Sequence, residues 1–444
     1  LSMAGAGIFI ARQAWVARAA LGRLEAGLAW GFGVWGLSWW TAGSLGEIDR
    51  FVPDTYAPST WVLWLSASTF LLELGSARWD WRPGRMMTLV SLPGAILLFF
   101  VFLDAVPHLL ARGGWLVWPP LFVTFFFLWE RLEDADSRLL RHFRSGCLWF
   151  FALFIATASS GLVGVGAGLE GDWAVAAFGV GLAGVLFGLV AAYERERPPF
   201  ERDRESALWS GLVPIASFAL ATIVGIQFEA RGNASPLPHL PLLNPIDLTV
   251  WLLALPVWSI WREVDRARDG SIDQGEKRAV LLVACTVAFA AFNGALVRAV
   301  HQWAEVPFSG DALWGSVAMQ VTFSIAWTLV GMAGMLVSSR RGWREAWMGF
   351  AGLLGIVVVK LFLVDLSQLS TVARIGTFLA VGALLLVLGY LSPVPPGSTP
   401  GSGGQGAPES AGSGGSDVGP VGDADADAGA SEATSGRGPI GETQ

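Results

Sequence analysis

The sequence has few of the residues that soluble, disulfide-bonded or metal-binding proteins depend on. Only 15% of its 444 residues are charged, whereas a soluble chain carries about 25%. Its two cysteines, Cys147 and Cys285, stand in no CxxC or Cys/His cluster, and His108, His142 and His239 are isolated in the sequence. No disulfide framework, metal site or cofactor is therefore predicted. Nucleotide-binding, GxSxG and HExxH motifs are also missing, which argues against an enzyme without excluding one.

Positive charge is scarce as well. The net charge is −7, but residues 392–444 contain seven acidic residues and only one basic residue, so the rest of the chain is nearly neutral. This balance excludes a nucleic-acid-binding surface. The 392–444 segment is rich in Gly, Ser, Pro and Asp and has no aromatic residue, so we expect a disordered tail.

Long apolar runs are what the sequence has in abundance, since 53% of its residues are hydrophobic. Each run is close to the 20 or so residues that a helix needs to cross a bilayer, and none shows the alternation of a barrel strand. The sequence therefore predicts an all-α, polytopic integral membrane helical bundle over residues 1–391, with 12–13 transmembrane helices. Because the sequence begins with Leu1, we interpret residues 1–12 as the end of a helix that starts upstream. The complete spans are expected near 25–45, 59–75, 86–106, 115–130, 145–167, 172–193, 207–228, 246–262, 278–299, 314–338, 345–365 and 373–391.

Basic residues alternate along this series of spans. Six connections hold 22 of the 29 Lys and Arg residues, whereas the intervening connections hold three. Lys and Arg concentrate on the cytoplasmic side of membrane proteins, so we place the basic connections and the tail in the cytoplasm. The basic connections are those at 12–23, 78–85, 131–144, 195–204, 262–278 and 340–344.

Small residues recur at helix-packing spacing. Gly27/Gly31 and Gly184/Gly188 form GxxxG pairs, and glycines also recur across 349–355. Such spacing lets neighbouring helices approach closely, so it predicts packing within the molecule.

Polar residues inside the predicted spans gather near their outer ends. Such residues are costly in a bilayer and usually face the bundle interior or a water-filled cavity. We therefore expect an outward-facing, cationic ligand-binding cavity, which would suit a phosphate or another anionic headgroup. In the alternative interpretation these side chains snorkel to the headgroups or hold helix hairpins together. The residues in question are Asn293, Arg298, His301, Gln320, Lys360, Asp365 and Arg374.

The C-terminal half resembles a bacterial family of large multi-pass inner-membrane proteins, the domain of unknown function 2339. The resemblance covers about 240–392, and it implies a multi-pass protein of the bacterial inner membrane without implying any reaction. One of its motifs, Asn244-Pro245-Ile246-Asp247, is also predicted to cap and begin a helix. The resemblance is carried by Leu243–Leu248, Asn293, Arg298–Trp303, Gln320–Ser324, Trp327, Lys360–Leu366, Arg374-Ile375 and Gly389-Tyr390.

Three functions remain open at this point. The first is binding or transport of an amphiphilic, anionic envelope molecule, such as a lipid or lipid-linked glycan, at the outer leaflet. The second is a membrane enzyme acting on a lipid-linked substrate, with His301 or Asp365 as acid or base. The third is a membrane scaffold without a small ligand, whose only partner is the bilayer.

Overall fold

The computed structural model describes residues 2–20, 22–132, 138–169, 171–198, 200–201, 204–268 and 271–361, and six positions between 379 and 390. Within these ranges all regular secondary structure is helical, which confirms the all-α prediction. The predicted tail lies outside the described residues. The elements are α1 (Ser2–Val16), α2 (Arg23–Phe51), α3 (Ala57–Arg78), α4 (Arg82–Met87), the 3-10 turn η1 (Thr88–Val90), α5 (Ser91–Ala105), α6 (Gly114–Arg131), α7 (Arg138–Gly161), the π-helical η2 (Leu162–Gly166), α8 (Asp172–Glu194), α9 (Arg204–Ser206), the π-helical η3 (Ala207–Leu212), α10 (Val213–Glu229), α11 (Pro245–Ala267), α12 (Gln274–Trp303), α13 (Gly310–Gly315), α14 (Val317–Arg341) and α15 (Arg344–Lys360).

The membrane character of the chain is confirmed by these helices. Six helical segments in the described part are long and apolar enough to cross a membrane. The other predicted spans that fall there are helical too, in α2, α3, α6, α11 and α15, whereas 373–391 lies largely outside it. The six segments are Arg82–Ala105, Arg138–Gly166, Asp172–Glu194, Arg204–Glu229, Gln274–Trp303 and Val317–Arg341.

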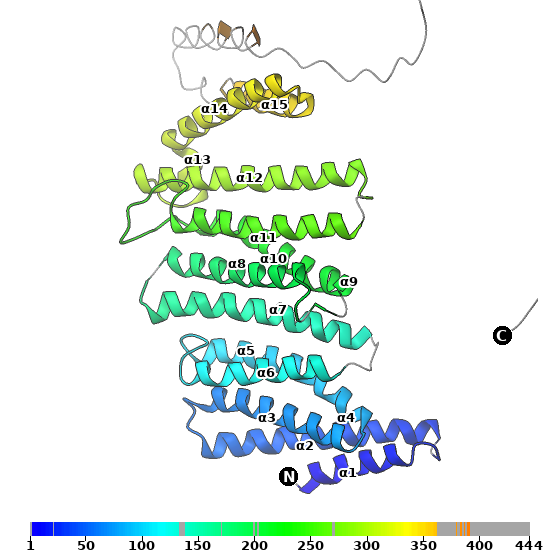
Figure 1. Cartoon of the computed structure of the whole chain (residues 1–444). Helices are drawn as coiled ribbons and strands as arrows, with labels where there is room; N and C mark the ends of the chain where they lie inside the picture. Colours follow the sequence, from blue (N-terminus) through cyan, green and yellow to red (C-terminus); the bar gives the residue numbers. More distant parts are fainter. Residues whose placement is uncertain are drawn as a thin grey trace, which may run out of the picture.

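The long helices lie side by side in an extended row that follows the order of the chain (Figure 1). Successive helices run in opposite directions, so their ends alternate between two sides of the row. We call the side where α6, α8 and α11 terminate the basic end, because the Arg-rich segments predicted to be cytoplasmic adjoin these termini. The other side is called the opposite end.

Two apolar cores hold the middle of the row together. In the first, α5, α6 and α7 pack around Trp118, whose ring contacts Phe99, Phe102, Phe150 and Phe154. In the second, α8 packs between α7 and α11, with α10 beside α11. This second core forms one side of the region described below.

The glycines at packing spacing make no close contact with the described residues. At Gly27, Gly31, Gly184 and Gly188 an added Cβ would meet no heavy atom of the described residues within 4 Å, and the same holds for the glycines of 349–355. Close approaches occur at other glycines instead. A Cβ at Gly7 would lie 2.8 Å from Gly36 Cα between α1 and α2. One at Gly179 would overlap Thr249 Cγ2 between α8 and α11, and one at Gly334 would overlap the Phe350 ring.

Candidate functional site

A large open groove lies between α10, α11 and α12, and its volume is about 910 Å³. Its floor is η3 and α10, because α10 packs against both α11 and α12. The two walls, α11 and α12, scarcely touch each other although they are consecutive in the chain. The groove therefore opens between two neighbouring helices of the row.

The side chains of the two walls explain why the groove stays open. On α11, Trp251 and Trp258 are seven residues apart, so they share a face of the helix. Both residues line the groove and are more than half exposed. On α12 the facing residues include Ala284, Ala288 and Ala291, which lie three or four residues apart. The small alanine side chains of α12 leave open space, and the tryptophan rings of α11 border that space from the other side.

The interior of the groove is apolar and its charges lie at the two ends. Among the described residues that line it, only Asp247, Arg268 and Glu276 are ionisable. Asp247 is in the first turn of α11 at the opposite end, whereas Arg268 and Glu276 lie at the basic end. Asp247 and Arg268 are 21 residues apart, which is about 32 Å along a helix. On α11 the apolar part thus matches the bilayer hydrocarbon core of about 30 Å.

At the basic end an accessible ion pair borders the groove. Arg268 Nη1 lies 3.0 Å from each carboxylate oxygen of Glu276, and the guanidinium lies over the Trp209 ring, 5.3 Å from its centroid. The Arg268 and Glu276 side chains are 42% and 49% exposed. Arg268 is thus held in place while remaining open to solvent.

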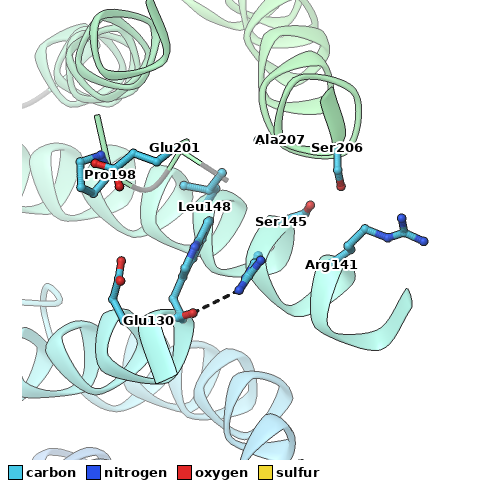
Figure 2. A pocket seen from close by; sticks show the side chains of 10 residues that line it. Glu130, Arg141, Ser145, Leu148, Pro198, Glu201, Ser206 and Ala207 are labelled. Atoms are coloured by element: carbon cyan, nitrogen blue, oxygen red, sulfur yellow. Dashed lines mark hydrogen bonds between the residues drawn. The ribbon is translucent and has the colours of Figure 1, made fainter. Parts of the chain in front are cut away.

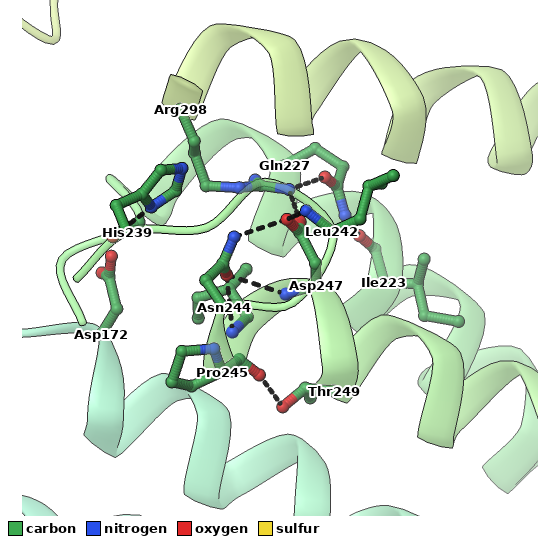
Figure 3. A network of polar contacts seen from close by, with 12 residues as sticks. Asp172, Ile223, Gln227, His239, Leu242, Asn244, Pro245, Asp247, Thr249 and Arg298 are labelled. Atoms are coloured by element: carbon green, nitrogen blue, oxygen red, sulfur yellow. Dashed lines mark hydrogen bonds and ion pairs between the residues drawn. The ribbon is translucent and has the colours of Figure 1, made fainter. Parts of the chain in front are cut away.

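At the opposite end the polar groups are buried in a closed network (Figure 3). Asn244 caps α11 as predicted, because its Oδ1 accepts hydrogen bonds from the Ile246 and Asp247 backbone N–H groups at 3.0 Å. Asp247 Oδ2 in turn accepts from Asn244 Nδ2 at 2.5 Å and from the Leu242 N–H at 2.9 Å. The second carboxylate oxygen, Asp247 Oδ1, accepts from Arg298, so both oxygens of Asp247 have partners.

Arg298 is the centre of this network. It is fully buried, and its Nη2 donates to Asp247 Oδ1 at 2.5 Å and to Gln227 Oε1 at 3.0 Å. These contacts join α10, α11 and α12 at one point. Arg298 Nε and Nη1 and His239 Nε2 are buried and find no partner among the described residues.

The segment 230–244 covers Arg298 from the opposite end. A Cβ at Gly232, where φ is +77°, would lie 3.0 Å from Arg298 Cδ and 2.9 Å from His239 Cε1. The segment is held by Asp172, which accepts the Asn233 N–H at 2.7 Å. Within the described part of the chain, Arg298 therefore lies in a closed network and not in an open cavity.

The other residues of the predicted cavity fall into separate groups. Lys360 Nζ donates to the Gln320 carbonyl at 3.1 Å and to Ser324 Oγ at 2.7 Å, which links α15 to α14. Asp365 and Arg374 lie outside the described residues.

Asn293 and His301, both on α12, have local partners. Asn293 Oδ1 accepts from Trp327 Nε1 at 2.9 Å, which ties α12 to α14. His301 Nδ1 lies 2.6 Å from the Val306 carbonyl oxygen. Neither contact brings these residues into the Arg298 network.

A smaller recess lies at the basic end between α6, α7 and the segment that precedes α10 (Figure 2). Arg141, Glu130 and Glu201 border it, and Arg144 Nη2 donates to the Trp129 carbonyl at 3.3 Å. Its volume of about 30 Å³ has room for about two or three water molecules. No three His, Cys, Asp or Glu side chains gather at a possible metal site in the described ranges.

The groove is the feature that the sequence interpretation missed. A signal was present in the Trp251/Trp258 spacing and in the alanines of α12. Both patterns are equally typical of helices that pack against a neighbour, so neither distinguishes an open groove from a closed interface.

The comparisons with known proteins bear on the whole chain. A family model described as "Predicted membrane protein (DUF2339)" matches residues 1–395. No curated protein and no solved structure matches the chain.

Proposed function

The chain belongs to the DUF2339 family of predicted membrane proteins, and from this premise we propose that it binds an amphiphilic, anionic envelope molecule whose hydrocarbon part lies in the groove between α11 and α12. The single observation that carries the proposal is the groove itself, which is apolar along about 32 Å of α11 and is bordered by charge only at its ends. In a membrane, hydrocarbon is what fills an open apolar space between helices. We take the basic end as cytoplasmic and the membrane as the bacterial inner membrane.

Binding is favoured over movement of a headgroup through this groove. A headgroup that crossed the bilayer there would pass only apolar side chains between Asp247 and Arg268. A charge at the bilayer centre costs several kcal/mol unless polar groups accompany it. The groove can therefore hold a hydrocarbon chain, but it offers the charged headgroup no polar path across the bilayer.

The test is native mass spectrometry of the full chain released from native membranes in mild detergent. Wild type is expected to carry a defined lipid mass. In the double variant Ala284→Trp/Ala288→Trp the two indoles fill the groove, so that mass is expected to fall at least tenfold. Leu282→Trp is the matched control, because Leu282 is on the same helix, is 68% exposed and does not line the groove.

The unfolding midpoint of each variant in mixed micelles separates loss of ligand from loss of fold. If the wild type carries no lipid, or if the folded double variant and the control carry as much as the wild type, the groove is not a binding site. The scaffold interpretation would then replace it.

A further inference from the structure

We infer that the groove binds one long-chain anionic lipid, with its phosphate at Arg268 on the basic end and its chain extending past the bilayer midplane toward Asp247. The chemical class is a polyisoprenyl phosphate rather than a two-tailed phospholipid. This inference rests on the proposed function and adds the orientation, the headgroup contact and the chain length.

The first argument is length, taken separately on the three helices that form the groove. The lining residues run from Asp247 to Arg268 on α11, from Glu276 to Phe292 on α12 and from Trp209 to Ile223 along η3 and α10. At about 1.5 Å per residue these distances are about 32, 24 and 21 Å. One leaflet supplies about 15 Å, half of the hydrocarbon core. On every helix the groove is longer than one leaflet, so a tail that stops at the midplane leaves much of it unfilled.

The second argument is that only one end can receive an anionic headgroup. At the opposite end Asp247 is negative, buried, and bonded through both oxygens to Arg298, Asn244 and Leu242. At the basic end Arg268 is accessible, and both of its bonds to Glu276 use Nη1. A guanidinium binds phosphate in bidentate fashion, and the Trp209 ring holds this one beside the groove. The contacts favour the basic end over Arg298, where the sequence had placed the headgroup.

The third argument concerns affinity. Lipid tails are as apolar as the groove, so moving a chain from bilayer to groove gains little hydrophobic free energy. Selective binding must come from packing along the groove and from the headgroup contact. Arg268 and the half of the groove nearer Asp247 should therefore make separate contributions to the binding free energy.

Glu276 allows the direction of a change in phosphate affinity to be predicted. Its carboxylate bonds Arg268 Nη1, so it competes for the guanidinium with a phosphate and repels it. Glu276→Gln removes both the competition and the repulsion and should strengthen binding several-fold. Arg268→Gln removes a charge-assisted contact and should weaken binding at least tenfold.

The experiment uses the full chain in detergent, titrated with undecaprenyl phosphate, farnesyl phosphate and phosphatidylglycerol, with bound masses counted by native mass spectrometry. Two tryptophan variants on α12 probe depth. Ala284 is eight residues from Glu276 and Ala291 is fifteen, or about 12 and 22 Å. Ala284→Trp should abolish binding of both isoprenoid phosphates, whereas Ala291→Trp should weaken undecaprenyl phosphate at least tenfold and spare farnesyl phosphate.

Equal binding of phosphatidylglycerol, with no effect of Ala291→Trp, would overturn the inference in favour of an ordinary phospholipid. No effect of Arg268→Gln would overturn the headgroup assignment. In either result Ala284→Trp would still reduce lipid binding, so the proposed function would stand. Only a protein that binds none of the lipids would overturn both.

Discussion

At the scale of single residues, the most consequential contact is the buried pair of Arg298 and Asp247. A buried charge that loses its partner costs about 3–5 kcal/mol, whereas replacing both partners by apolar groups costs much less. Asp247→Ala should therefore destabilise the protein by about 3–5 kcal/mol, and adding Arg298→Met should recover part of that loss. The measurement is the midpoint of SDS-induced unfolding in mixed micelles, followed by tryptophan fluorescence.

Arg278 provides the control for this prediction. It forms an ion pair with Glu345 at 3.0 Å, but the two side chains are 66% and 76% exposed. Exposed pairs contribute about 0–1 kcal/mol, so Arg278→Gln should leave the midpoint almost unchanged. If the double variant were less stable than Asp247→Ala alone, Arg298 would have a stabilising role independent of Asp247.

The sequence identified the members of this network without their pairing. Asn244 and Asp247 were predicted to begin a helix, and they do so. Arg298 was identified as a polar residue near a helix end, but its two partners are 51 and 71 residues away in the chain. A single sequence gives the depth of each residue in the membrane, and depth does not determine which helices are neighbours.

At the scale of helices, α8 contains two glycines that test which of its faces are packed. A side chain at Gly179 would overlap the Thr249 methyl group on α11, whereas at Gly184 there is open space around the described residues. Overpacking of this kind costs about 1–3 kcal/mol, so Gly179→Val should lower the unfolding midpoint clearly. Gly184→Val, five residues away on the same helix, should leave it nearly unchanged. Equal losses in both variants would mean that helix propensity dominates over packing.

The glycine pattern shows why element positions are more predictable than element contacts. Every predicted span in the described part coincides with a helix, because the length and hydropathy needed to cross a bilayer are local properties. Which glycine faces a neighbour depends on the rotation of two helices about their axes. Gly184 and Gly188 have GxxxG spacing, yet the contact with α11 is made at Gly179.

The groove follows from the same dependence on helix rotation. Consecutive helices joined by a short connection are expected to pack together, but α11 and α12 meet mainly through α10. The alanines of α12 face the tryptophans of α11 across open space. Hydropathy identifies both helices as apolar, but it does not predict the distance between them.

At the scale of the whole molecule, the row of helices has two chemically different sides. The Arg-rich segments adjoin one side, and the segment 230–244 and α13 lie on the other. Lys and Arg in short loops are retained on the cytoplasmic side, so the basic end should face the cytoplasm. The proposed headgroup contact at Arg268 would then lie in the inner leaflet, and the buried Arg298 network would lie toward the outside.

Single-cysteine labelling tests this orientation in intact cells. The background variant replaces Cys147 with Ala and Cys285 with Ser, because Cys147 is buried and Cys285 exposed. Cysteine is then introduced at Ser271, between α11 and α12 at the basic end, or at Asp311 in α13, both exposed positions. A membrane-impermeant maleimide should label Asp311→Cys in intact cells, and Ser271→Cys only after the membrane is permeabilised. The reverse pattern would place Arg268 in the outer leaflet, where the lipid proposed to bind the groove would have to present its phosphate from outside the cell.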